Sequence, residues 1–137
     1  MAVEIIRTAA DGSMGFGDYT LTEKTKIVDF PFQGDLYKVK TFTEITKLKK
    51  NGVLVYESVP GTKVENFKAE ERRVSFVVEG RANTQITLDL EEEQEYRVVV
   101  DDTILGNMKT KIGGKLIISV DLTNGNSQRV VIERIQL

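Results

Sequence analysis

The sequence predicts an all-β fold, an antiparallel β-sandwich or jelly-roll-like domain of about nine strands that spans residues 1–137. β-Branched and other apolar residues alternate with polar residues through most of the second half of the chain. This period of two is typical of strands that are buried on one face. Turn-forming residues recur about every ten positions, and the segments between neighbouring strands are too short to be crossover helices. These observations favour antiparallel sheets over a βαβ arrangement.

The second half of the chain contains five predicted strands. In one of them Ile86, Leu88 and Leu90 share a face, while polar residues lie between them. The alternation implies that each strand buries one face in a common interior. The predicted strands cover 74–80, 84–90, 96–102, 115–122 and 128–135.

The first half is less regular, but its composition also favours strands. We expect strands at residues 3–8, 17–24 and 36–42, because apolar and β-branched residues are enriched there. Pro31 marks a bend between the last two of these segments, since proline has no backbone N–H for a central strand.

A hairpin and a possible helix overlap in the next segment. Asn51-Gly52 offers the two positive-φ residues of a type I′ turn, which predicts a hairpin over residues 47–58. Residues 41–50 also allow a short helix, because Thr41 is a suitable N-cap and three apolar residues follow at helical spacing. The enrichment in threonine and isoleucine favours a strand, so one short helix is the alternative.

The stretch DGSMGFGDY, residues 11–19, contains three glycines and raises the question of a phosphate-binding loop. Such a loop needs a helix directly after it, so that backbone N–H groups point at the anion. The residues that follow alternate instead of forming an apolar helical stripe, and no Gly-Lys-Ser/Thr is present. The stretch therefore predicts a turn or a bulged strand.

Composition excludes several classes of chemistry. The 137 residues include no cysteine and no histidine, so disulfides, thiolate nucleophiles, Ser/His/Asp triads and the usual zinc sites are ruled out. The formal net charge of −2 gives no overall field that would attract nucleic acid or an anionic membrane. We expect no cofactor. The N-terminal residues do not have the pattern of a signal peptide, and no apolar run is long enough to span a bilayer, so we expect a cytoplasmic protein.

Clustered carboxylates supply the candidate metal site. Asp89, Glu91, Glu92 and Glu93 lie close together in the sequence, and oxygen ligands of this kind suit calcium. The spacing matches no calcium-binding loop, and a solvated acidic turn is the alternative. No pair among the 21 acidic residues can be selected as catalytic, so we assign no catalytic residue.

Aromatic and basic residues supply the candidate binding sites. Tyr19, Tyr37 and Tyr56 are candidates for stacking against sugar rings, in place of the absent tryptophan. Two basic patches, one formed by Lys47, Lys49, Lys50 and Lys63 and the other by Lys109, Lys111 and Lys115, are not interleaved with exposed aromatic residues as nucleic-acid readers are.

Three stretches resemble a family of small bacterial all-β proteins of unassigned function, some of which carry the label endosialidase. They are DGSMGFGDYTL, GDLYKVKTFTEITKLKKNGVLVYESVPGTKVENF, and the tail from VVEG to VVIERI. The resemblance covers nearly the whole chain and implies a compact stand-alone domain. A weaker resemblance, in the rhythm of strands and turns over residues 95–135, links the chain to β-sandwich modules of carbohydrate-active enzymes.

We therefore expect a non-catalytic binding or assembly module that associates with itself through an edge strand or an apolar face, as a homo-oligomer. The alternative is a carbohydrate-directed protein, either a glycan binder or a carboxylate-based glycosidase of the endosialidase kind. We expect neither nucleic acid nor a membrane as a partner.

Overall fold

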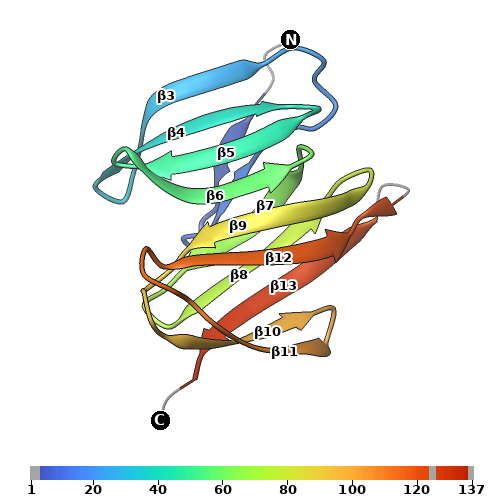
Figure 1. Ribbon diagram of the computed structural model, residues 1–137. Coiled ribbons are helices and arrows are strands. Elements are labelled where there is room, and N and C mark those ends of the chain that lie inside the picture. Colours follow the sequence, from blue (N-terminus) through green and yellow to red (C-terminus); the bar gives the residue numbers. More distant parts are fainter. Residues whose placement is uncertain (1–3, 124–125, 136–137) are drawn as a thin grey trace.

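Two antiparallel β-sheets make up the computed structural model, which describes residues 4–123 and 126–135 (Figure 1). The all-β prediction is confirmed, and no α-helix occurs in these residues. The seven-stranded sheet has the order β1 (Ile6–Thr8), β2 (Met14–Phe16), β7 (Lys63–Ala69), β8 (Arg73–Glu79), β13 (Ser127–Arg134), β10 (Glu95–Val100) and β11 (Thr103–Lys109). The six-stranded sheet has the order β12 (Lys115–Asp121), β9 (Asn83–Asp89), β6 (Val53–Val59), β5 (Ile45–Lys50), β4 (Asp35–Phe42) and β3 (Thr25–Phe32).

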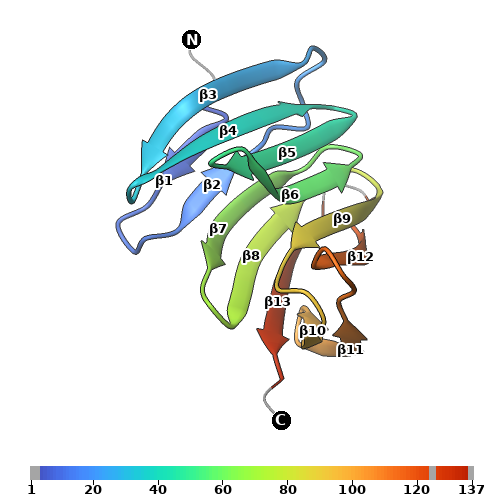
Figure 2. The ribbon, with the colours of Figure 1, turned by 60° about the vertical axis from the view of Figure 1, so that its left-hand side comes forward.

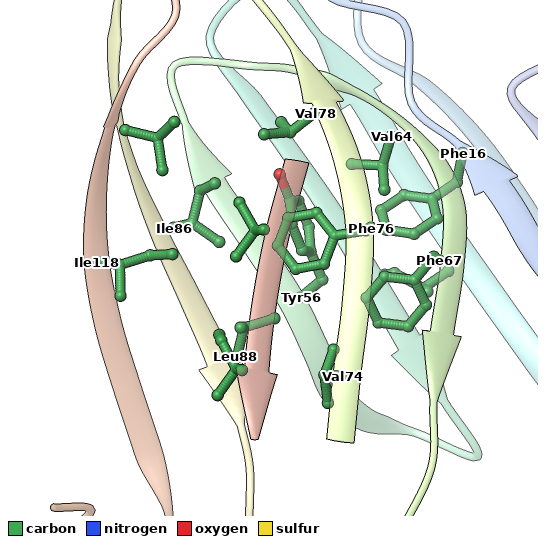
Figure 3. Close-up of a cluster of buried hydrophobic side chains, with 14 of the residues drawn as sticks. Phe16, Tyr56, Val64, Phe67, Val74, Phe76, Val78, Ile86, Leu88 and Ile118 are labelled. Carbon is green, nitrogen blue, oxygen red and sulfur yellow. The ribbon is translucent and has the colours of Figure 1, made fainter. Parts of the chain in front are cut away.

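The core lies between the two sheets, where the apolar residues of alternating strands meet. Figure 3 shows the aromatic centre of this core, with side chains from both sheets. The ring of Tyr56 on β6 lies 5.1 Å from that of Phe16 on β2 and 5.7 Å from that of Phe76 on β8, both edge to face. Such pairs contribute about 0.5–1.5 kcal/mol each beyond the burial of their area. The aromatic cluster therefore holds the six-stranded sheet against the seven-stranded one.

The structure contains thirteen strands among its described residues, so the predicted number of about nine is wrong. β1 and β2 have three residues each, too few to show a period of two. β7 contains a bulge between Glu65 and Lys68, where Asn66 has a φ of 55°, and β10 meets β11 at another bulge. Bulges break the alternation on which the prediction depends.

The predicted strand at residues 17–24 is also wrong, because this segment is a loop between β2 and β3. The Asp18 carboxylate accepts hydrogen bonds from the backbone N–H and the hydroxyl of Thr20. Aspartate that bonds the backbone two residues later competes with strand pairing. The strand begins only at Thr25.

Pro31 lies inside β3 and not at a bend between strands, which corrects the interpretation of that residue. β3 is an edge strand that pairs only with β4. An edge position tolerates proline because one side of the strand makes no ladder hydrogen bonds. The strand over residues 25–32 was therefore missing from the prediction.

Residues 41–50 form the end of β4, a turn and β5, so the strand interpretation is confirmed over the helix. The predicted hairpin between β5 and β6 is confirmed as well. Asn51 and Gly52 have φ values of 50° and 83°, as a type I′ turn requires. The Asn51 side chain also donates a hydrogen bond to the Asp35 carboxylate at 2.8 Å.

The glycine-containing stretch forms the turn between β1 and β2, together with β2 itself, as predicted. The Asp11 carboxylate accepts hydrogen bonds from the N–H and the hydroxyl of Ser13, at 2.9 and 2.6 Å. These bonds lower the pKa of Asp11. No helix follows the stretch, so its backbone does not form a phosphate cradle.

None of the described residues form a helix with the length and apolar character needed to cross a bilayer.

Candidate binding surface

Six lysines gather on the outer surface of β3, β4 and β5 and the loop before β3. Figures 1 and 2 show these three strands side by side at one end of the six-stranded sheet. On β4 and β5 the lysines alternate with buried residues such as Val39 and Leu48, so the pleat directs them away from the core. We call this surface the lysine face; it consists of Lys24, Lys26, Lys38, Lys40, Lys47 and Lys49.

The strand register places lysines directly opposite one another. Lys40 on β4 lies opposite Lys26 on β3 and opposite Lys47 on β5. Lys38 and Lys49 form a third pair of the same kind. Directly opposed like charges destabilise a sheet, typically by a few tenths of a kcal/mol to about 1 kcal/mol per pair. The arrangement therefore costs stability.

The lysines of this surface make no ion pair with a carboxylate in the described residues. Glu57 on β6 lies opposite Lys47, but the described residues form five ion pairs and none of them includes a lysine of the lysine face. The pKa of Lys40 is lowered, first by the positive charge of Lys24 and then by loss of solvent and the neighbouring lysines. A lowered pKa for an ammonium group among like charges indicates an uncompensated positive potential.

The charge of the molecule is strongly segregated. Removing the six lysines of the lysine face from the formal net charge of −2 leaves −8 on the rest of the chain. A nearly neutral total charge thus hides a concentrated positive surface. Such a surface attracts anions locally, whatever the sign of the total.

The first basic patch predicted from the sequence is divided by the fold. Lys47 and Lys49 belong to the lysine face, whereas Lys50 lies 3.5 Å from the Asp35 carboxylate and Lys63 is on β7 in the other sheet. Sequence reasoning missed the contribution of β3 and β4. The signal was present as lysine at every second position in two consecutive strands, KVK and KLK.

The structure separates the three candidate tyrosines. Tyr56 is fully buried, so its ring offers no face to a sugar. The Tyr19 hydroxyl donates a hydrogen bond to the Glu79 carboxylate at 2.7 Å, and the Arg81 guanidinium lies 5.3 Å from the Tyr19 ring centre. The bond to Glu79 raises the pKa of Tyr19, with burial as the next cause. The Tyr19 hydroxyl and ring are therefore already engaged by Glu79 and Arg81 within the fold.

Tyr37 lines a cleft of about 270 Å³ that opens between the two sheets, near the turns from β1 to β2 and from β3 to β4. Its ring lies 6.3 Å from that of Phe32, and burial raises the pKa of Tyr37. Asp35, Lys50 and other polar residues share the lining. Two aromatic rings beside carboxylate and ammonium groups suit a small polar ligand.

The acidic residues proposed as a metal site do not converge in the structure. No group of three or more acidic side chains in the described ranges, 4–123 and 126–135, converges in a way that could hold a metal ion. Asp89 lies 3.3 Å from Lys115, and Glu91 lies 3.0 Å from Arg134. The Glu92 carboxylate accepts a hydrogen bond from the N–H of Gly113, and Glu93 is exposed with a φ of 56°. The structure thus directs Asp89, Glu91 and Glu92 to separate partners.

Self-association stays a prediction, and β11 is one edge strand at which it could occur. β11 pairs only with β10, and its residues Ile104 and Leu105 are exposed. An exposed edge strand can pair with the same strand of a second copy. Light scattering that shows only monomers would contradict this prediction.

No protein-family model, curated protein or solved structure matches the chain. The resemblance to the endosialidase-labelled family therefore stays a prediction as well. The arrangement of the chain's own residues supplies the evidence about function.

Proposed function

We propose that the chain is a non-catalytic binding module, a β-sandwich whose lysine face holds a polyanion. Three directly opposed lysine pairs carry this proposal. They lower the stability of the sheet when no anion is present, and an anion placed across them converts repulsion into attraction. Binding sites retain such destabilising arrangements of charge because the same charges bind the ligand.

The geometry suits a ligand with several closely spaced negative charges. Neighbouring strands are about 4.8 Å apart, and lysines two positions apart on one strand are about 6.7 Å apart at their Cα atoms. Lys38, Lys40, Lys47 and Lys49 border one small depression on the sheet. A single monovalent anion would contact only part of this array, whereas a polymer or surface of anions would contact all of it.

The test is the binding of fluorescently labelled inorganic polyphosphate, followed by anisotropy over a range of salt concentrations. The wild-type chain should bind, and the logarithm of the association constant should fall linearly with the logarithm of the salt concentration. The variant for comparison carries Lys38→Gln, Lys40→Gln, Lys47→Gln and Lys49→Gln. We expect it to bind at least about thirty-fold more weakly at low salt, with a slope smaller by about 3 to 4.

A matched variant loses the same number of charges elsewhere. It carries Lys63→Gln, Lys68→Gln, Lys109→Gln and Lys111→Gln, and we expect its affinity to stay within about three-fold of wild type, since exposed charges beyond a Debye length of about 10 Å are screened. Equal losses in both variants, or no binding by the wild-type chain, would refute the lysine face as the binding surface.

A second candidate function is glycan binding at the Tyr37 cleft. The observation that favours it is the pair of aromatic rings, Tyr37 and Phe32, next to the Asp35 carboxylate and the Lys50 ammonium group. Tyr37→Ala should abolish any binding detected on a glycan array, while Tyr19→Ala should leave it intact. An array without a specific signal would remove this candidate.

A further inference from the structure

Exposed apolar side chains lie at one end of the lysine face. Val28 and Leu36 keep 56% and 50% of their surface exposed. Val28 and Leu36 line a shallow depression of about 350 Å³ together with Lys38 and Lys49. Asn51 and Gly52, at the hairpin turn between β5 and β6, border the same depression. We call Val28 and Leu36 the apolar tip.

A solvated polyanion does not gain affinity from an apolar tip, because its phosphates, sulfates or carboxylates contact only the ammonium groups. An anionic bilayer surface uses both features. Its headgroups attract lysines, and its acyl boundary accepts apolar side chains a few ångströms below the headgroups. Clusters of four to eight lysines or arginines are typical of proteins that bind anionic lipids.

We propose that the partner of the lysine face is an anionic lipid surface, into which the apolar tip inserts. The inference rests on the proposed polyanion binding and adds the class of partner. It departs from the expectation drawn from net charge, because the total of −2 does not reveal how the charge is distributed.

The residue types on the lysine face favour lipid over nucleic acid. All six cations are lysines, whereas the planar fork of arginine is the better match for fixed phosphate pairs. Phe42, the aromatic residue of β4 on this surface, is half-buried, and the Lys24 ammonium group lies 5.8 Å from its ring centre. That ring is therefore not a free platform for a base. Flexible lysine stems suit mobile lipid headgroups better than they suit an ordered polymer.

The experiment compares sedimentation with phosphatidylcholine vesicles that contain or lack phosphatidylserine. The wild-type chain should bind only the vesicles that contain phosphatidylserine, and salt should weaken this binding. An apolar-tip variant carries Val28→Ser and Leu36→Ser. We expect it to bind the anionic vesicles about ten-fold more weakly and to bind polyphosphate within about two-fold of wild type. The control carries Ile112→Ser and Ile117→Ser, which replace exposed residues in the loop after β11 and on β12. It should bind vesicles like wild type.

A direct probe of insertion is available because the chain contains no tryptophan. Leu36→Trp introduces a single indole at the apolar tip, and Ile112→Trp introduces one in the exposed loop between β11 and β12 as a control. On vesicles that contain phosphatidylserine, the emission of the indole at position 36 should shift to the blue and be quenched by brominated lipids. The indole at position 112 should show neither effect.

Each outcome separates the two proposals. Polyphosphate binding with no shift at position 36, and with equal vesicle binding by wild type and the apolar-tip variant, would overturn the lipid proposal in favour of a soluble polyanion such as a nucleic acid or an acidic polysaccharide. Absence of polyphosphate binding would overturn the proposed function itself. Circular dichroism and urea unfolding of each variant establish that losses of binding do not come from unfolding.

Discussion

The hydroxyl of Thr62 lies 2.8 Å from the Tyr56 hydroxyl and 2.8 Å from the Ser58 hydroxyl, inside the core. The Thr62 N–H donates to the Thr46 hydroxyl, which in turn donates to the Thr62 carbonyl, both at 3.0 Å. The described residues leave no buried side-chain nitrogen or oxygen without a partner. Unpaired polar groups in a core cost about 1–3 kcal/mol each, so this network is needed for the core to contain hydroxyls at all.

Thr62→Val should therefore destabilise the protein by about 2–4 kcal/mol, because two buried hydroxyls lose a shared partner. Thr84→Val is the matched control, since the buried Thr84 hydroxyl makes one hydrogen bond, to the Ala82 carbonyl. We expect this control to cost about 1 kcal/mol. Urea unfolding measures both values, and equal costs would contradict the role given to Thr62.

Tyr56 also makes stability depend on pH at the alkaline end. Burial raises the pKa of Tyr56 well above its usual value of 10.0. Above pH 10 the unfolded chain loses the Tyr56 proton while the folded chain keeps it, so stability falls as the pH rises, by up to about 1.4 kcal/mol per pH unit. Tyr56→Phe should remove this contribution. The difference in unfolding free energy between wild type and Tyr56→Phe should be constant below pH 9. Above that pH, wild type should lose stability relative to Tyr56→Phe. A difference that stays constant up to pH 11 would contradict the assignment.

Where β2 ends, the chain passes close to the segment between β6 and β7. Gly17 has a φ of 90°, and a Cβ atom added there would lie 2.4 Å from the Thr62 carbonyl oxygen. This carbonyl belongs to the backbone and cannot move aside easily. Gly34, in the turn between β3 and β4, has a similar φ of 83° with open space around it.

Gly17→Ala should therefore cost much more than Gly34→Ala. The positive φ alone costs an L residue about 1–2 kcal/mol, which both variants share, and the clash at Gly17 should raise its cost beyond about 3 kcal/mol. Thermal or urea unfolding gives the comparison. Similar losses in the two variants would mean that the close approach of β2 to Thr62 is not as described.

At the level of whole strands, the sequence predicted the strand positions correctly where apolar and polar residues alternate without interruption. The segments 84–90 and 115–122 became β9 and β12, because every second residue, such as Ile86 or Ile118, enters the core. Prediction failed where local chemistry departs from alternation. Asp18 turns a segment with strand-like composition into a loop, and Pro31 is tolerated in β3 only because β3 is an edge. Edge position is a property of the sheet and cannot be seen in one segment.

The lysine face shows a similar limit for the candidate site. The alternating lysines of β4 and β5 are visible in the sequence, but their alignment depends on register. A shift of one residue would have placed Lys40 opposite Thr46 or Leu48, which are buried, instead of opposite Lys47. Lys26 joins the surface only because β3 pairs with β4 at that register. The tyrosines illustrate the opposite case, since Tyr56 and Tyr37 have similar strand contexts and differ only in what packs over them.

For the molecule as a whole, the central claim concerns the effect of the lysine face on stability. Repulsion between its lysines lowers the free energy of unfolding of the free chain, and a bound anion restores that free energy. Lys40→Glu tests both parts, because glutamate at position 40 would lie opposite Lys26 and Lys47 and turn two repulsive pairs into attractive ones. Lys111→Glu, in the loop between β11 and β12, changes the charge equally away from the lysine face. It serves as the control.

The most direct measurement is the free energy of unfolding of wild type, Lys40→Glu and Lys111→Glu, each with and without inorganic polyphosphate. Without polyphosphate, Lys40→Glu should be more stable than wild type by about 1 kcal/mol, while Lys111→Glu should differ little. With saturating polyphosphate, wild type and Lys111→Glu should gain stability and Lys40→Glu should gain much less, so that the order of wild type and Lys40→Glu reverses. If Lys40→Glu is no more stable than wild type without polyphosphate, or if polyphosphate stabilises all three chains equally, the lysine face is not a binding surface of the kind described.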